Sequence, residues 1–245
     1  MKKKIILSKE QITYIDNYLK YHKVKYWDIR IELLDHIVSD VEDKMTQGLS
    51  FDDAMVDVHK GFGNSMKMLW NTGVEYSIFA NGDGYKDLIQ VKREQINKKY
   101  RKLYFKEIKN FFKSFRNIIA LALIFYFDYV LFENVEYRLF KRINMIVFLT
   151  PSIFFLMYSI RNFIVKNKSV HLEYALWYYI FPFFILNMLL QISNPNGIFE
   201  SSKEFQIVVL AIIAPLNLVF SYCGLQLYKR TYNKYTKIFK QLQSL

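Results

Sequence analysis

The apolar residues of this chain follow two patterns, one before and one after residue 116. Before it, apolar residues recur every three or four positions between charged ones, which is typical of amphipathic α-helices. After it, they form four nearly continuous stretches: Asn117–Phe132, Ile143–Ile160, Tyr174–Ile192 and Phe205–Tyr228. About 20 mostly apolar residues are needed for a helix to cross a bilayer. We therefore predict an all-α chain, with a small soluble helical bundle followed by a four-helix transmembrane bundle.

The first pattern predicts three short helices within residues 1–80. Ser8 and Gln11 have the spacing of a capping box at the start of the first helix. Ser50 is placed to cap the third helix, and Gly48 is placed to end the second. The second helix, Trp27–Gln47, is expected to bury one apolar stripe: Trp27, Ile31, Leu34, Val38, Val41 and Met45. Helices with one apolar face each are predicted to pack into a bundle.

A basic segment, residues 81–116, connects this bundle to the predicted transmembrane domain, residues 117–245. A long helix is expected over Tyr85–Arg116, and Lys98–Arg116 contains eight Lys or Arg residues and one acidic residue, Glu107. Its second half has an apolar face among lysines, so it fits a helix lying on anionic headgroups. A stalk that continues into the first membrane helix is an equally open interpretation.

The net charge of +12 is divided equally between residues 1–116 and 117–245. Basic residues gather beside the apolar stretches, where they set membrane orientation, and no patch typical of nucleic-acid binding stands apart from them. If the N-terminus is cytoplasmic, the cytoplasmic flanks contain 16 Lys or Arg residues and the outer loops contain 4. We therefore expect both termini in the cytoplasm, the lipid bilayer as a partner, and no nucleic-acid partner.

The charged residues of the second helix are the candidates for partner binding: Glu32, Asp35, His36, Glu42 and Asp43. Glu32, His36 and Asp40 share one helix face, but the first and last lie about 12 Å apart at 1.5 Å per residue, too far to hold one metal ion. A solvated or partner-facing surface is the favoured interpretation. The chain contains no zinc-protease, nucleophile-elbow or phosphate-loop motif. We expect no enzymatic activity, no metal and no cofactor.

The predicted membrane helices contain a few polar residues and prolines of interest: Asp128, Asn144, Asn187, Asn217, Pro151, Pro182 and Pro215. Asp128 is expected to lie at the membrane interface or to pair with Arg138 or Arg142, with a proton or ion relay as the alternative. The asparagines are expected to hydrogen-bond between helices, and the prolines to kink them. A polar, kinked substrate cavity is the alternative for these residues.

Three sequence blocks resemble a known family: Glu32–Ile37, Gly48–Ala54 and Gly61–Gly63. Together they are similar to the helical cytoplasmic prefix domains called HAAS or permease-prefix domains, over about residues 8–70. The family often has Leu-Gly-x-Pro where this chain has Phe62-Gly63-Asn64-Ser65. In bacteria such domains precede multipass membrane segments, so the resemblance implies the bacterial plasma (inner) membrane and a sensory or regulatory appendage.

The expected function is therefore regulatory or scaffolding, with a cytoplasmic protein or a second copy of the chain as partner. The alternative is a small permease or the membrane subunit of a transporter, which would use Asp128, Asn187 and Asn217. Four spans without an obvious inverted repeat are few for a lone secondary transporter. The transport alternative would therefore require oligomerisation or an ATPase partner.

Overall fold

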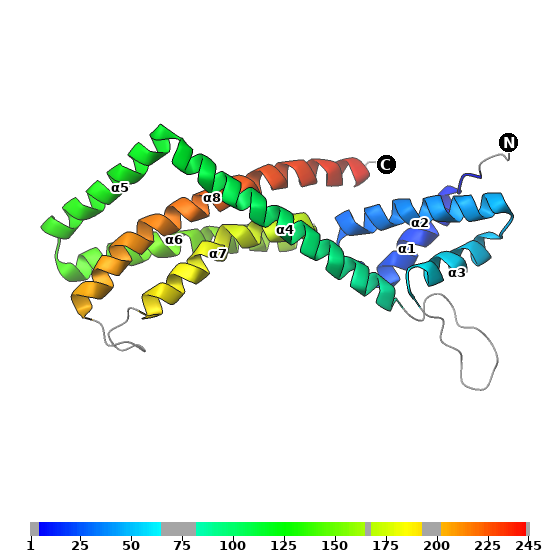
Figure 1. Ribbon diagram of the computed structural model, residues 1–245, viewed down its shortest axis with the longest axis horizontal. Helices are drawn as coiled ribbons and strands as arrows, with labels where there is room; N and C mark the ends of the chain where they lie inside the picture. Colours follow the sequence, from blue (N-terminus) through cyan, green and yellow to red (C-terminus); the bar gives the residue numbers. More distant parts are fainter. Residues whose placement is uncertain (1–4, 65–81, 165–167, 193–201, 244–245) are drawn as a thin grey trace, which may run out of the picture. The chain divides into compact units, whose positions relative to one another are not determined.

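The computed structural model describes residues 5–64, 82–164, 168–192 and 202–243. Within these ranges the protein has eight α-helices and no β-strand, which confirms the all-α prediction (Figure 1). The chain forms two compact units. Unit 1 comprises Met1–Ile96 and Lys168–Val170, and unit 2 comprises Asn97–Asn167 and His171–Leu245.

Unit 1 is built from α1 (Lys9–Tyr21), α2 (Trp27–Gln47), α3 (Phe51–Gly61) and the first part of α4 (Asp83–Lys113). The predicted capping box is present, because the Ser8 amide donates to the Gln11 side chain at 2.9 Å and the Gln11 amide donates to the Ser8 hydroxyl at 3.3 Å. Gly48 ends α2 with a φ of 113°, a left-handed conformation that favours glycine. The Ser50 hydroxyl accepts from the Asp53 amide and caps α3. The local signals for these three helices are confirmed.

The buried face of α2 differs from the predicted stripe. Trp27 and Val41 are buried as expected, but the other buried positions of this helix are Ile29, Leu33 and Ile37. The remaining predicted residues, Ile31, Leu34, Val38 and Met45, are half-buried. The reason is that α2 packs against both α1 and α3. A helix that packs between two neighbouring helices buries a wider part of its surface than a single apolar stripe. The spacing of its apolar residues does not determine which of them lie at the centre of that buried surface.

Unit 2 contains α5 (Phe115–Asn134), α6 (Tyr137–Ile164), nearly all of α7 (Val170–Ile192), and α8 (Lys203–Gln243). All four helices are long and apolar enough to cross a membrane, and they coincide with the four predicted stretches. No residue of α5 is buried, and large apolar side chains such as Leu123 and Phe127 are exposed along it. Such a surface would be costly in water and is matched by lipid chains.

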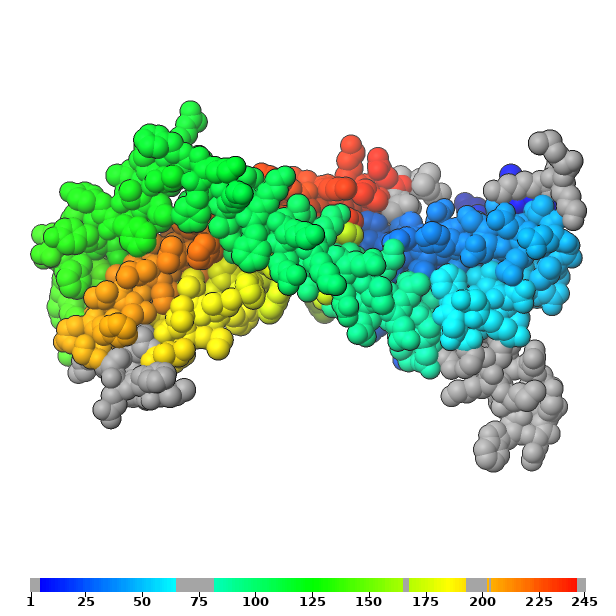
Figure 2. All heavy atoms as spheres, in the orientation of Figure 1, coloured from blue at the N-terminus to red at the C-terminus, as the bar shows by residue number. Residues whose placement is uncertain are grey.

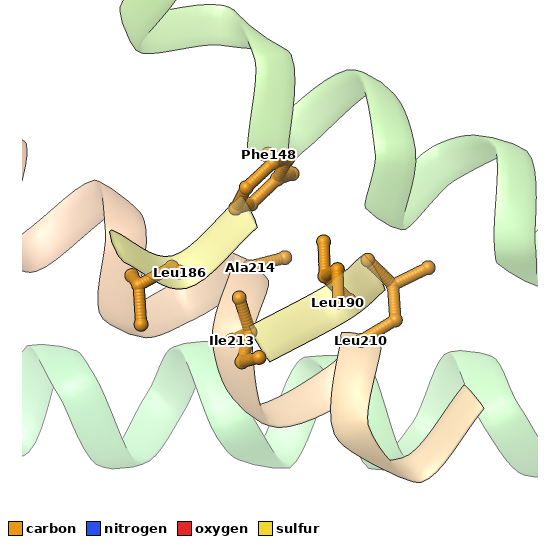
Figure 3. Close-up of a cluster of buried hydrophobic side chains, with 6 residues drawn as sticks. All are labelled: Phe148, Leu186, Leu190, Leu210, Ile213 and Ala214. Atoms are coloured by element: carbon orange, nitrogen blue, oxygen red, sulfur yellow. The ribbon is translucent and has the colours of Figure 1, made fainter. Parts of the chain in front are cut away.

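The core of unit 2 lies where α6, α7 and α8 meet. Figure 3 shows one buried cluster of apolar side chains from these three helices. Helix α6 contributes Phe148, α7 contributes Leu186 and Leu190, and α8 contributes Leu210, Ile213 and Ala214. The surfaces of α7 and α8, yellow and orange in Figure 2, lie against each other along one face of this unit. Pro151, Pro182 and Pro215 lie inside α6, α7 and α8, and each helix continues through its proline.

Helices α7 and α8 approach each other closely at Gly224. A Cβ atom added there would lie 2.5 Å from the Cα of Tyr179 and 2.6 Å from the Tyr178 carbonyl oxygen. Both atoms belong to the backbone of α7, so they cannot move aside independently. Small residues at such crossings allow membrane helices to pack backbone against backbone.

The second half of α4 packs against α7 and α8 within unit 2. Tyr100 and Tyr104 are buried, and the Tyr104 hydroxyl donates to the Phe220 carbonyl of α8 at 3.3 Å. The Tyr178 hydroxyl of α7 donates to Asn97 at 2.8 Å. Helix α4 ends at Lys113, and Ser114 has an extended ψ of 114° before α5 begins. The apolar face of this segment is thus partly covered by protein, and α4 does not run unbroken into α5.

Candidate functional site

The candidate partner-binding residues of α2 divide into two groups. Asp35, His36 and Asp43 are exposed and make no hydrogen bond or ion pair within the described ranges. Glu32 forms an ion pair with Lys92 of α4, and Glu42 accepts a hydrogen bond from the Leu7 amide at 3.1 Å. Glu32 and Glu42 therefore make contacts within unit 1, while the other three present ionisable groups to the surroundings.

Unit 1 also contains a buried polar cluster that sequence analysis missed. The Tyr18 hydroxyl lies 2.6 Å from His59 Nδ1 and 2.8 Å from the Tyr85 hydroxyl. The three residues come from α1, α3 and α4, and their rings pack edge to face. No local motif could reveal the cluster, because its members are 41 and 67 residues apart in sequence.

Burial dominates the electrostatics of this cluster. Desolvation raises the pKa of Tyr85 to about 12, although hydrogen bonds with Tyr18 and Asn64 oppose the rise. Desolvation also raises the pKa of Tyr18, and the neighbouring Tyr85 adds to that effect. Both phenols are therefore neutral at physiological pH. The cluster is suited to joining α1, α3 and α4, rather than to acid–base chemistry near neutrality.

Asp128 does not pair with either arginine considered in the sequence analysis. Its Oδ1 accepts a hydrogen bond from Nδ2 of Asn144 at 2.8 Å, and this contact joins α5 to α6. Arg138 and Arg142 are exposed. Of the alternatives for Asp128, the pair with an arginine is therefore not formed, because the carboxyl group bonds to the amide of Asn144.

Two further polar contacts join helices of unit 2 around Pro151. The Asn217 amide of α8 donates to the Phe148 carbonyl of α6 at 2.8 Å, and Asn217 is fully buried. The Tyr179 hydroxyl of α7 donates to the carbonyl of Pro151 itself at 2.9 Å. Asn144 and Asn217 thus form the interhelical bonds expected of them. Asn187 is half-buried on α7 and takes part in neither contact.

Two of the cavities in unit 2 border α5. The larger has a volume of about 410 Å³ and lies between α5, α6 and α8, with Asn117, Thr150 and Ser221 as polar residues among mostly apolar walls. The smaller has a volume of about 190 Å³ and contains Asp128 in its wall. Ligand sites typically occupy 300–1,000 Å³, so the first has the size of a drug-like site and the second suits only a smaller molecule.

Within the described residues, no three His, Cys, Asp or Glu side chains gather closely enough to hold a metal ion. No protein family, curated protein or solved structure matched the chain. The functional argument therefore rests on the chemistry of the two units themselves.

Proposed function

We propose that this protein is a membrane-anchored regulatory or scaffolding protein whose unit 1 binds a cytoplasmic partner through α2. The observation that carries the proposal is the exposed face formed by Asp35, His36 and Asp43, which we call the α2 acidic face. None of these three side chains contributes a hydrogen bond or ion pair to the described structure. A partner with a basic surface would be oriented by complementary charge.

The membrane placement supports this proposal. Four helices have the length and composition of membrane spans. Sixteen Lys or Arg residues flank them on the side proposed to be cytoplasmic and four on the other. We therefore propose that unit 1 and both termini lie in the cytoplasm of a bacterial cell, with the protein in the plasma (inner) membrane. The resemblance of residues 8–70 to cytoplasmic prefix domains is consistent with that arrangement.

A small permease, or the membrane subunit of a transporter, is the second candidate. Asp128 favours it, because an ionisable group beside a cavity within an apolar helix is often functional. Against it, the Asn217 side chain is fully buried and donates to a backbone carbonyl of α6, so it serves helix packing. Asn187 remains as a polar group without such a contact. The regulatory proposal, unlike the transport proposal, gives a role to the exposed charged residues of α2.

Site-specific photo-crosslinking in native membranes would test the α2 acidic face. A photoreactive amino acid at Ser39, which is exposed on the same part of α2, should yield one discrete adduct. Its mass would distinguish a different protein from a second copy of the chain. The double substitution Asp35→Lys and Asp43→Lys should reduce the adduct at least tenfold, because both charges facing the partner reverse.

The matched control is the double substitution Asp87→Lys and Glu94→Lys on α4, where both residues are also exposed. It changes net charge by the same amount and should leave the adduct intact. A crosslink equally reduced by both double variants would show a general charge effect. That result, or no adduct at Ser39, would refute the proposed binding face.

A further inference from the structure

The smaller cavity of unit 2 combines a carboxyl group with aromatic walls. Helix α5 contributes Asp128 together with Phe125, Tyr129 and Phe132, which share one helix face at spacings of three and four residues. Phe140 of α6 completes the aromatic wall, and its ring packs edge to face on Phe132 with centroids 5.4 Å apart. The remaining wall is aliphatic and comes from α8.

The carboxyl group in this cavity has a neutral protein partner. One oxygen of Asp128 accepts from the amide of Asn144, which is 2% exposed. Among the described residues no Lys, Arg or His forms an ion pair with Asp128. An amide can orient a carboxylate but cannot neutralise it, so a negative charge here lacks a counter-charge from the protein.

Aromatic rings attract cations through the negative potential over their faces. Four aromatic rings and one carboxyl group within an apolar helix bundle therefore suit a ligand that is both positively charged and apolar at its surface. A metal ion would require several oxygen ligands, which the lining does not offer. Organic ammonium ions combine positive charge with a methylated or alkyl surface.

The cavity volume limits the ligand further. The cavity is open at the surface of the unit, where Tyr129 and Phe132 are exposed, and about 190 Å³ accommodates a ligand of roughly six or seven non-hydrogen atoms at about 30 Å³ for each water-sized group. We infer that the cavity lined by Asp128, Tyr129 and Phe140 binds a compact organic ammonium ion. Asp128 supplies the counter-charge, Asn144 orients the carboxylate, and the aromatic rings contact the alkyl groups. This inference concerns unit 2 alone and does not depend on the α2 acidic face.

Two probes that differ in charge and share one shape would test this site. Choline and 3,3-dimethylbutan-1-ol have the same skeleton, with a quaternary nitrogen in the first and a carbon atom in the second. Binding to the full chain in lipid nanodiscs would be measured by titration calorimetry. Choline should bind at least tenfold more tightly than the alcohol. Equal binding of the two would show an apolar cavity without cation recognition and would overturn the inference, as would the absence of choline binding.

The substitution Asp128→Asn keeps the shape of the side chain and removes its charge. It should weaken choline binding at least tenfold and leave binding of the alcohol unchanged. Glu133→Gln is the matched control, because Glu133 is an exposed acid on the same helix and should have no effect. Tyr129→Leu should weaken choline binding several-fold through loss of an aromatic face. Unchanged choline affinity in Asp128→Asn would contradict the proposed role of the carboxylate.

Discussion

The crossing of α7 and α8 at Gly224 gives a sharp test of how unit 2 is packed. Replacing Gly224 by alanine would place a Cβ 2.5 Å from the Tyr179 Cα, where ordinary contacts begin at 3.4 Å. The helices would have to separate locally by about 1 Å, a gap that forfeits a quarter to a half of each dispersion contact along the crossing. Overpacking of this kind costs about 1–3 kcal/mol.

Two opposing effects determine the size of the change. Alanine is better than glycine in a helix by about 1 kcal/mol, so the net loss for Gly224→Ala should be about 1 kcal/mol. Leucine has a similar helix propensity to alanine and places three further carbon atoms against the backbone of α7. Gly224→Leu should therefore lose about 3 kcal/mol or more of unfolding free energy. The predicted order of stability is wild type, then alanine, then leucine.

Unfolding in mixed detergent micelles would measure the free energy, and Cys223 would provide a local readout. Cys223 is the single cysteine of the chain and is 2% exposed beside the crossing. Its labelling by a maleimide should be slow in the wild type and faster in both variants. Ala122→Leu on the exposed surface of α5 is the control for added bulk and should change neither measurement. A leucine variant as stable and as slowly labelled as the wild type would refute the close crossing.

Two further outcomes follow from the buried polar groups. Asn217→Leu should lower the unfolding free energy of unit 2 by about 0.6–1.7 kcal/mol, because hydrogen bonds between membrane helices contribute about 0.6 kcal/mol on average and about 1.7 kcal/mol at most. An unchanged value in mixed micelles would contradict the role of Asn217. Because folding raises the pKa of Tyr85 from 10 to about 12, the stability contributed by its neutral phenol is complete below pH 10 and is lost as pH rises toward 12. Denaturant unfolding followed by circular dichroism at pH 8 and pH 11 should therefore show a loss that is smaller in Tyr85→Phe, and equal losses in both proteins would contradict this linkage.

Local sequence signals predicted the helices well because the responsible interactions are local. The capping box of Ser8 and Gln11, the left-handed Gly48 and the Ser50 cap each act within four residues. The four candidate membrane helices follow from length and continuous apolarity alone. In both cases the backbone N–H and C=O groups need hydrogen-bond partners. Capping residues and continuous apolar stretches, which can be recognised in the sequence, mark where a helix provides them.

Tertiary partners could not be predicted in the same way. The buried arc of α2 centres on Leu33 and Ile37 because two neighbouring helices cover it, and helical periodicity marks apolar positions without ranking them. The union of Tyr18, His59 and Tyr85 depends on the arrangement of three helices. For Asp128, the negative charge suggested an arginine as one possible partner. The packing of α5 against α6 places the amide of Asn144 beside the carboxyl group instead.

The polar side chains of unit 2 differ in whether their contacts within the protein leave a charge that a ligand could neutralise. Asn217 and Tyr179 donate to backbone carbonyls, and each contact exchanges one neutral donor for one neutral acceptor. Asp128 is different, because its bond to Asn144 supplies a donor and leaves the negative charge in place. An apolar environment then favours either uptake of a proton or arrival of a cation. Binding of a proton would not involve the aromatic rings around this carboxyl group. Binding of an organic cation would, because the faces of these rings attract positive charge.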